Sequence, residues 1–464
     1  MSSLLIRNGT IITASDHYRA DVLVKDERVA CIAETLDEPV DRVIDAEGCY
    51  LFPGGIDAHT HMELPFMGTF ASDTFHSGTL AGLHGGTTTI IDFAIQTQGE
   101  SLESAIQEWH RKADGHAVGD YAFHCAVTDF NENTRQEIPR VINEHGINSF
   151  KTFMAYKGAL MVDDRQMFEL MKELVKHGGI ITTHAENGDM VDHLVQKFLA
   201  EGKTEPRYHV LSRPPICEAE ASGRAIDLAH QAECPLYIVH MTCEESLARV
   251  RNATLRNQKV HAETCVQYLL LDDSLYFQEG FEGAKVVMSP PLRKPKDQQA
   301  LWAAINQNLI QHVATDHCPF CSNQKEMGID NFSKIPNGAP GIETLMILLH
   351  SEGVVKGRIS LERMVDVLSS GTARMFGLKD KGEIAVGKDA DIIVFDPDQK
   401  FTITQSKLHM NVDYTPFEGV EIIGMPNAVY SRGSKVSQWN GDQMDFVGEV
   451  GRGRFVKREP FEGF

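Results

Sequence analysis

Both ends of the chain alternate apolar and polar residues with a period of two, and glycine and aspartate punctuate the alternation. This pattern is typical of antiparallel strands, in which successive side chains point to opposite faces of a sheet. Because the two ends share the pattern, we expect them to meet in one small β-domain. The segments are SLLIRNGTII (3–12), ADVLVKDERVACIA (20–33), GEIAVGKDADIIVFDP (382–397) and NAVYSRGSKVSQ (427–438).

Between the two ends, short apolar runs alternate with stretches of helical periodicity. The stretch 164–179 shows this periodicity clearly, because its apolar residues recur at steps of three and four before Gly178 provides a stop. Strands that alternate with helices in this way predict an α/β fold, the (β/α)8 TIM-like barrel. The eight expected strands are 51–61, 87–94, 121–129, 147–156, 178–187, 235–242, 259–270 and 309–320.

These patterns divide the chain into two domains and a tail. Residues 1–50 and 379–440 are expected to build a small β-sandwich, and residues 51–378 the barrel. The tail, 441–464, ends in a basic and aromatic stretch although the protein as a whole is acidic. It either contacts a neighbouring subunit in an oligomer or is solvated, and the sequence leaves both alternatives open.

The charge balance disfavours polyanionic partners. Among 464 residues, 44 are Lys or Arg and 65 are Asp or Glu, which gives a formal net charge of −21. This charge repels nucleic acids and anionic membranes. No segment is long and apolar enough to span a bilayer, and the first residues show no signal-peptide core. We therefore expect a cytoplasmic protein with no nucleic-acid or membrane partner.

The nine cysteines are scattered, and their odd number in such a protein predicts free thiols. Cys318 and Cys321 have the spacing of a zinc or redox pair. A structural zinc site of this type needs a second pair of ligands, and none is placed to supply it. We interpret both residues as unpaired thiols near a loop.

Metal-competent or chargeable side chains gather at the carboxyl ends of the expected strands, where barrels of this type place their active sites. His59 and His61 lie two residues apart on one strand, so both imidazoles share a face and can bind one ion. Each residue alone has an ordinary explanation, such as a histidine satisfied in the core or a capping aspartate. Their convergence predicts a metal site. The six residues are His59, His61, Lys151, His184, His240 and Asp316.

Lys151 lies in an apolar run, INSFKTFMAY, where an unpaired ammonium is costly to bury. A neutral, desolvated lysine amine can react with carbon dioxide to give a carbamate. The two carbamate oxygens suit a bridge between two metal ions, and the reaction removes a cation from an apolar site. Two alternatives stay open: Lys151 forms a buried ion pair with a carboxylate, or the strand register points it outward.

The motifs around these residues resemble those of the amidohydrolase superfamily, in its cyclic-amidase branch of dihydropyrimidinases and D-hydantoinases. The resemblance covers nearly the whole chain, in the family's order. It implies a barrel with a β-sandwich built from both chain ends, and a homotetramer. The motifs are FPGGIDAHTH, GGTTTIIDF, SFKTFMAYKG, HAENGD, PLYIVHMT, ETCVQYLLLD, SPPLR, ATDHCPF, IPNGAPG and KGEIAVGKDADIIVFDP.

The resemblance also implies a cofactor, namely two divalent metal ions. The ions are normally zinc (Zn2+), although manganese (Mn2+) and cobalt (Co2+) suit such ligands. A hydroxide would bridge them. The implied assignments are His59, His61 and Asp316 for the first ion, His184 and His240 for the second, and a carbon dioxide-derived carbamate on Lys151 as the bridge between both.

The reaction implied by the resemblance opens a hydantoin or dihydropyrimidine ring to an N-carbamoyl amino acid. The bridging hydroxide would attack the ring carbonyl, with Asp316 as general base and then general acid. Tyr156 matches the tyrosine that donates to the developing oxyanion. Ser289 and Asn337 match residues whose backbone groups hold the cyclic amide.

The loop HTHMELPFMGTF narrows the expected substrate. Dihydroorotases and allantoinases usually place an arginine just after the second histidine, whereas this chain has Met62, so an acidic ring is disfavoured. Leu64, Phe66 and Phe153 resemble the apolar positions around the exocyclic substituent in hydantoinases, with ordinary packing under a loop as the alternative. We expect a small, uncharged cyclic ureide or imide and, from the resemblance, D-selectivity.

Two other interpretations stay open. Another cyclic amidase, such as an allantoinase, is one of them. A non-catalytic scaffold of the same fold is the alternative from a different class. The intact set of six ligands disfavours the scaffold, because the non-catalytic relatives, the collapsin response mediator proteins, have lost several ligands.

Overall fold

Parallel strands form the central barrel of the protein, and the computed structural model describes residues 3–461. Each strand pairs with its neighbours in chain order, and a bridge between Thr60 and His317 joins the last strand end to the first. The predicted (β/α)8 barrel is therefore confirmed. The eight strands are β8 (Gly55–Thr60), β11 (Thr87–Ile95), β12 (Asp120–Ala126), β13 (Ser149–Phe153), β14 (Ile180–His184), β15 (Leu236–Ile238), β16 (Val260–Cys265) and β17 (His312–Ala314).

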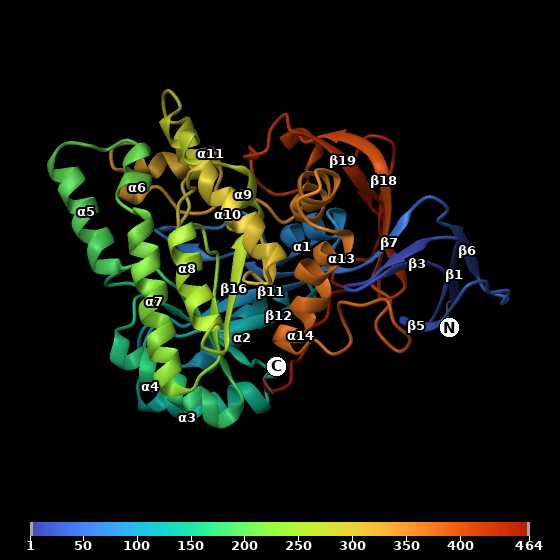
Figure 1. Ribbon diagram of the computed structural model, residues 1–464, viewed down its shortest axis with the longest axis horizontal. Coiled ribbons are helices and arrows are strands. Elements are labelled where there is room, and N and C mark those ends of the chain that lie inside the picture. Colours follow the sequence, from blue (N-terminus) through green and yellow to red (C-terminus); the bar gives the residue numbers. More distant parts are fainter. Residues whose placement is uncertain (1–2, 462–464) are drawn as a thin grey trace.

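Helices connect the strands and lie on the outside of the barrel (Figure 1). The helix predicted over 164–179 is α4. Asp163 caps its N-terminus by accepting from Gln166 N at 2.8 Å, and Gly178 ends it with a φ of +72°. The helices are α1 (Phe75–His84), α2 (Leu102–Ala113), α3 (Glu132–Asn143), α4 (Asp164–His177), α5 (Gly188–Ala200), α6 (Arg207–Leu211), α7 (Pro215–Ala232), α8 (Glu244–Thr254), α9 (Val266–Leu270), α10 (Pro295–Asn306), α11 (Ser322–Lys325), α12 (Leu345–Leu348), α13 (Leu361–Val365) and α14 (Gly371–Phe376).

The first expected strand, 51–61, is in fact divided between two sheets. Its first part is β7 (Tyr50–Pro53), which pairs with a strand of the β-sandwich, and only β8 belongs to the barrel. Gly54 separates the two parts. A Cβ at this position would lie 2.1 Å from Thr88 Oγ1, so the chain can pass this close to the barrel only as glycine.

The seventh expected strand, 259–270, is also shorter than the apolar run that predicted it. The strand ends at Cys265, and the residues that follow form α9. A continuous apolar run does not distinguish a buried strand from a buried helical turn, which is why the pattern overestimated this strand.

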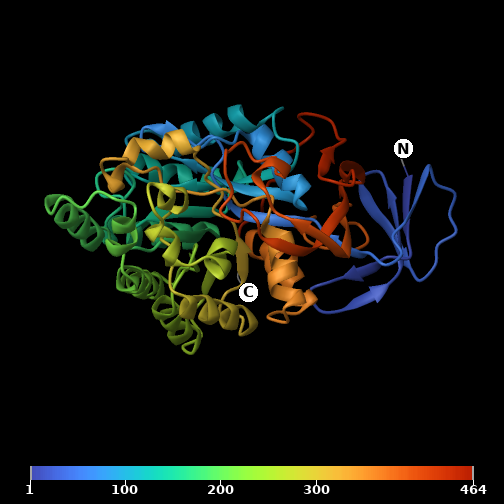
Figure 2. The same cartoon turned by 90° about the horizontal axis from the view of Figure 1, so that it is seen from above.

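Two further sheets form the β-sandwich, and strands from both chain ends share one of them, as predicted. The seven-stranded sheet has the order β21-β20-β19-β18-β7-β2-β3, so late strands pair with early ones. Figures 1 and 2 show it between the barrel and the four-stranded sheet, β5-β4-β1-β6, which lies at the end of the molecule near the N-terminus. The sandwich strands besides β7 are β1 (Ser3–Arg7), β2 (Thr10–Ile12), β3 (His17–Arg19), β4 (Asp21–Lys25), β5 (Arg28–Ala33), β6 (Arg42–Asp45), β18 (Ile392–Thr402), β19 (Glu421–Ser431), β20 (Ser434–Trp439) and β21 (Met444–Phe446). The domain limits at residues 50, 378 and 440 stay a prediction.

The C-terminal tail packs on the barrel of its own chain, at the end where the strands begin. Tyr121 N donates to Arg454 O, and Phe461 N donates to Gly178 O. Phe455 packs with its ring centroid 5.8 Å from that of Tyr121. The described part of the tail is therefore not a solvated extension, and its contact with a neighbouring subunit stays a prediction.

No helix of residues 3–461 is long and apolar enough to cross a membrane. All nine cysteines lie in this range, and all are free thiols, as predicted. Cys318 is buried and Cys321 is partly exposed.

Candidate metal centre

The six residues predicted to bind metal lie at the carboxyl ends of five barrel strands and line one cavity. The barrel brings them together because parallel strands end at the same face. Their roles as ligands stay a proposal. The positions are His59 in β8, His61 just beyond β8, Lys151 in β13, His184 at the end of β14, His240 just beyond β15 and Asp316 just beyond β17.

Three residues that line this cavity and carry a β-carbon have a left-handed backbone. The φ angle is +65° at Tyr156, +38° at His240 and +52° at Asp316. This region is strained for residues that carry a β-carbon, and such strain gathers at functional sites where the surroundings hold it. Thr315, just before Asp316, is held by a hydrogen bond from its hydroxyl to Asp57.

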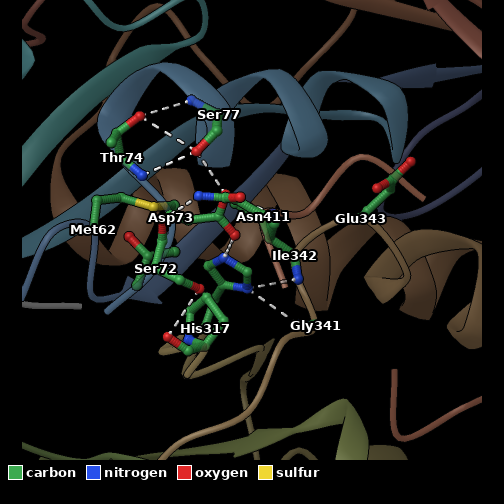
Figure 3. Close-up of polar contacts among 12 residues, drawn as sticks. Met62, Ser72, Asp73, Thr74, Ser77, His317, Gly341, Ile342, Glu343 and Asn411 are labelled. Carbon is green, nitrogen blue, oxygen red and sulfur yellow. Dashed lines mark hydrogen bonds and ion pairs between the residues drawn. The ribbon is translucent and has the colours of Figure 1, made fainter. Parts of the chain in front are cut away.

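Figure 3 shows how the residue after Asp316 is held. His317 and Asp73 are both fully buried, and His317 Nε2 donates to Asp73 Oδ2 at 2.9 Å. The other ring nitrogen, Nδ1, accepts from Gly341 N at 3.1 Å and from Ile342 N at 3.4 Å. These bonds select the neutral ring with its proton on Nε2, and they tie the end of β17 to the segment of Gly341.

Two groups of donor atoms converge in the cavity. His59 Nε2 and His61 Nε2 lie 3.2 and 3.1 Å from Asp316 Oδ1. His184 Nδ1 lies 2.9 Å from His240 Nε2. The two groups adjoin, because the ring centroids of His59 and His240 are 5.3 Å apart. His59, His240 and Asp316 offer three donor atoms within 4.8 Å of one another, which makes them a candidate metal-binding group.

Two buried carboxylates determine which nitrogen of an imidazole faces the cavity. Glu263 Oε1 accepts from His59 Nδ1 at 2.7 Å, so His59 Nε2 keeps its lone pair for the cavity. Glu186 Oε2 accepts from His184 Nε2 at 2.8 Å, so His184 Nδ1 keeps its lone pair in the same way. Imidazoles held by a carboxylate on the far nitrogen are typical of metal ligands. The donor set therefore fits divalent metal ions.

Lys151 lines the cavity and is 1% exposed, which excludes the outward-facing alternative. Its Nζ atom lies 4.8 Å from the ring centroid of Phe93 and 5.3 Å from that of Phe153. Within residues 3–461, Lys151 forms no ion pair with a carboxylate. Burial lowers the pKa of Lys151 to about 8, although the negative charges of Asp316 and Glu263 oppose that shift.

Burial also keeps three of the imidazoles neutral. It lowers the pKa of His59 and of His240 well below the ordinary value, and it lowers the pKa of His184. For Asp316, burial acts to raise the pKa, but the interactions with His59 and its neighbours outweigh burial and hold the pKa below its usual value. Neutral imidazoles and an ionised carboxylate are the forms that bind a cation.

The residues predicted to bind substrate line the same cavity. Tyr156 forms edge-on ring contacts with Phe66 and Phe153, with centroids 5.5 and 6.1 Å apart. The side-chain oxygen of Asn337 is buried and has no partner among the described residues. The six are Leu64, Phe66, Phe153, Tyr156, Ser289 and Asn337.

Sequence reasoning missed the residues that hold the donors in place. Each is an acidic residue in or beside an apolar run, and that was the available signal: Glu263 interrupts VHAETC in the same way that Lys151 interrupts its own strand. It also missed Ile95 and Leu160, two apolar residues of the cavity wall. The missed acidic residues are Asp57, Asp73, Asp92, Glu186 and Glu263, all of them buried.

The fold and the cavity define a class of protein. A (β/α)8 barrel that gathers imidazoles, a carboxylate and a buried lysine at its strand ends is typical of hydrolases that activate water with metal ions. A sequence model described as "Amidohydrolase family" matches residues 50–422. The chain belongs to the amidohydrolase family and is a hydrolase.

Relatives of similar length narrow this assignment. A D-hydantoinase from Geobacillus stearothermophilus is 47% identical over 459 residues, which cover 98% of this chain and 97% of the relative. A D-hydantoinase from Streptomyces coelicolor is also 47% identical, over 464 residues that cover 98% of each chain. Among solved structures, the dihydropyrimidinase from Brevibacillus agri NCHU1002 is 49% identical and matches with a TM-score of 0.97 over 100% of both chains.

Proposed function

We propose that this hydrolase opens the ring of hydantoins or dihydropyrimidines to give N-carbamoyl amino acids, with preference for the D-configuration. The observation that carries the proposal is the single cavity in which the donor set meets an apolar wall and the residues expected to hold a cyclic amide. The D-hydantoinase and dihydropyrimidinase names of the full-length relatives support the substrate class.

We assign two divalent metal ions to the donor set, with zinc as the first choice and manganese or cobalt as alternatives. The orienting carboxylates and the depressed pKa of the buried lysine support this assignment. When bound, such ions supply a nucleophile from water at neutral pH and polarise the carbonyl. The ligands would be His59, His61 and Asp316 for one ion, His184 and His240 for the other, and a carbamate on Lys151 for both.

The chain's own residues would move the proton and stabilise developing charge. In the reaction, a C–O bond forms to the ring carbonyl carbon and the ring C–N bond breaks. Asp316 would accept the proton of the attacking water and return it to the leaving ring nitrogen. The Tyr156 hydroxyl would donate to the carbonyl oxygen as it gains negative charge. Burial raises the pKa of Tyr156, so its hydroxyl stays protonated and able to donate.

The remaining wall of the cavity would orient the ring. Backbone groups of Ser289 and Asn337 would hold the cyclic amide. Leu64, Phe66 and Phe153 would surround the exocyclic substituent, where their apolar surfaces favour hydrogen, alkyl or aryl groups over charged ones. An acidic ring substrate would meet no cationic partner in this part of the wall.

The experiment that tests the proposal is ring opening by metal-loaded protein on dihydrouracil and on a 5-aryl hydantoin, with chiral analysis of the N-carbamoyl product. Faster opening of dihydrouracil would assign a pyrimidine-degrading activity. Faster opening of the aryl hydantoin would assign a hydantoinase and support the apolar wall. If neither ring opens while metal is bound, the substrate class is wrong, and the scaffold and other cyclic amidases become the leading interpretations.

We also propose that the protein is a cytoplasmic homotetramer, which rests on the family resemblance and on the composition of the chain. Light scattering coupled to size-exclusion chromatography would test the oligomeric state. A mass of one chain would contradict the tetramer without affecting the proposed reaction.

A further inference from the structure

Helix α11 is a single turn that follows the DHCPFC motif, and the reaction proposed above uses none of its residues. Its last two residues, Gln324 and Lys325, nevertheless contact three separate segments that line the substrate cavity. These contacts give the helix a role that neither the free thiols nor the metal centre explains.

Lys325 is a buried lysine whose partners are backbone carbonyls. It is 1% exposed, and its Nζ atom donates to Val287 O at 3.0 Å, Pro336 O at 2.6 Å and Gly338 O at 2.7 Å. Burial lowers the pKa of Lys325 to about 7, but three carbonyl acceptors around Nζ favour the ammonium form, because its three N–H donors satisfy all of them. Buried carbonyls that lose such a donor carry an unfavourable desolvation cost.

The three carbonyls belong to the two segments that carry the expected amide-binding residues. Val287 lies two residues before Ser289, while Pro336 and Gly338 lie on either side of Asn337. Ser289 and Asn337 both line the cavity. The segments also meet directly, because Gly338 N donates to Val287 O at 2.9 Å. Lys325 is therefore the side chain that joins both segments from behind the cavity wall.

Gln324 makes the corresponding contacts with a third segment. Its Nε2 atom donates to Thr69 Oγ1 at 2.7 Å and to Phe70 O at 2.8 Å. Both residues lie on β10 (Thr69–Phe70), which pairs with β9 (Pro65–Phe66) in a short hairpin. Phe66 projects from this hairpin to the cavity. The Oε1 atom of Gln324 accepts from Cys321 N at 2.8 Å, and this bond fixes the Gln324 side chain to the start of α11.

We propose that α11 is a positioning element for the substrate cavity, in which Lys325 sets the wall that holds the ring amide and Gln324 sets the hairpin that faces the exocyclic substituent. Both are positioning residues, because they act through Ser289, Asn337 and Phe66. The kinetic part of this proposal rests on the proposed function, whereas the structural part does not.

The structural part is tested by hydrogen–deuterium exchange on the metal-loaded protein. Lys325→Met removes the three donors at similar side-chain length, and Lys325→Gln keeps two donors. Lys334→Met is the matched control, because Lys334 is exposed and lies nearby in the chain. We expect faster exchange in peptides that cover 286–290 and 336–340 in the methionine variant, an intermediate rate in the glutamine variant and no change in the control. Equal exchange in all four proteins would overturn the positioning role, whatever the protein catalyses.

The kinetic part compares the two variants on an unsubstituted and an aryl-substituted ring. Lys325→Met should lower kcat/KM for dihydrouracil and for a 5-aryl hydantoin by the same factor, on the order of 10²-fold, since a small displacement of a positioned group has that effect. Gln324→Met should lower the aryl hydantoin rate relative to dihydrouracil. Gln278→Met, at an exposed glutamine, is its control.

The outcomes separate the two ideas. If the wild-type protein opens neither ring, the proposed function fails, and the exchange measurement still decides the positioning role. If both rings open but Gln324→Met also lowers kcat/KM for both substrates by the same factor, the separate roles of Lys325 and Gln324 are wrong. Bound metal should equal the wild-type content in every variant, because neither residue contacts a proposed ligand; loss of metal would assign the effect to the metal centre and overturn the proposal.

Discussion

Glu186 and His184 form a buried pair, with 2.8 Å between the carboxylate Oε2 and the imidazole Nε2. The same carboxylate oxygen also accepts from Arg213 Nη1 at 3.4 Å. The pair turns His184 Nδ1 toward His240. Glu186 is not one of the proposed metal ligands, but it sets the orientation of His184, which is.

Removal of the Glu186 charge should weaken metal binding. In Glu186→Gln, the hydrogen bond to His184 loses its charged acceptor, and changes of this kind typically lower metal affinity 10- to 100-fold. The measurement is the chelator concentration that removes half of the bound metal. Glu201→Gln is the control, because Glu201 is exposed and pairs with a surface lysine, Lys203. Equal chelator resistance of both variants and the wild type would contradict the orienting role.

Lys151 should be essential for metal retention if its carbamate bridges the ions. Lys151→Ala removes the bridge and leaves the imidazoles without the negative charge that two dications need, so we expect loss of bound metal together with activity. Metal content per chain after gel filtration is the measurement, and Lys172→Ala, at an exposed helix position, is the control. Full metal retention by Lys151→Ala would contradict the bridging role of Lys151.

A direct observation of the carbamate complements that variant. Wild-type protein exchanged into 13C-labelled bicarbonate should show a protected carbamate carbon resonance, and Lys151→Ala should lack it. A signal of equal intensity in both proteins would assign the carbamate to a different lysine.

The barrel and the cavity residues were predictable because their signals are local. Eight apolar runs with helices between them specify the order of strands, and the carboxyl ends of parallel strands meet by necessity. Lys151 was recognisable as a functional residue because an unpaired ammonium is costly to bury in an apolar run. The same logic applied to Glu263 would have found a residue that joins His59 to the backbone of His240.

Other features depend on contacts between distant segments, and no local pattern encodes them. His59 and Glu263 are 204 residues apart in the chain. The role of Lys325 becomes visible only when segments near Val287 and Asn337 are placed around it. The division of 51–61 into β7 and β8 likewise depends on a close approach of Gly54 to another strand.

Tyr156 should contribute to the rate and not to metal binding. Tyr156→Phe removes the hydroxyl that would donate to the developing oxyanion, and loss of one such donor typically lowers kcat by about 10²–10³-fold. We expect a smaller change in KM and an unchanged metal content. Tyr18→Phe, at a residue that is 41% exposed, is the control. A kcat within twofold of the wild type would remove Tyr156 from the mechanism.

Lys381 links the barrel to the β-sandwich through three carboxylates, of which those of Asp120 and Asp391 are buried. Its Nζ atom lies 2.8 Å from Asp391 Oδ2 and 3.0 Å from Asp389 Oδ2, and it also bonds Asp120 at the start of β12. Burial alone would lower the pKa of Lys381, but these carboxylates outweigh burial and raise it. The pKa of Asp120 is lowered, because Lys381 and Arg432 outweigh the opposing effect of burial.

Lys381→Met should therefore destabilise the protein in a manner that depends on pH. Removal of one partner from a buried ion group lowers the free energy of unfolding by about 3–5 kcal/mol, because the remaining charges are left without compensation. In the variant, burial without the lysine raises the folded-state pKa of Asp120 above its value in the wild type. It also raises further the pKa of Asp389, which burial already holds above the usual value. A group with a raised folded pKa contributes stability at low pH and loses it as pH rises.

The difference in unfolding free energy between wild type and Lys381→Met should thus be larger near neutral pH than near pH 4. Urea unfolding at both pH values measures it, and Lys400→Met, at an exposed position of β18, is the control. In the wild type, the contribution of Asp120 to stability has the opposite sense at acid pH, because the depressed pKa of Asp120 makes that contribution fall as pH falls through the pKa. A difference that is independent of pH would mean that Lys381 acts by packing, and that the carboxylates around it are not ionised in the folded protein.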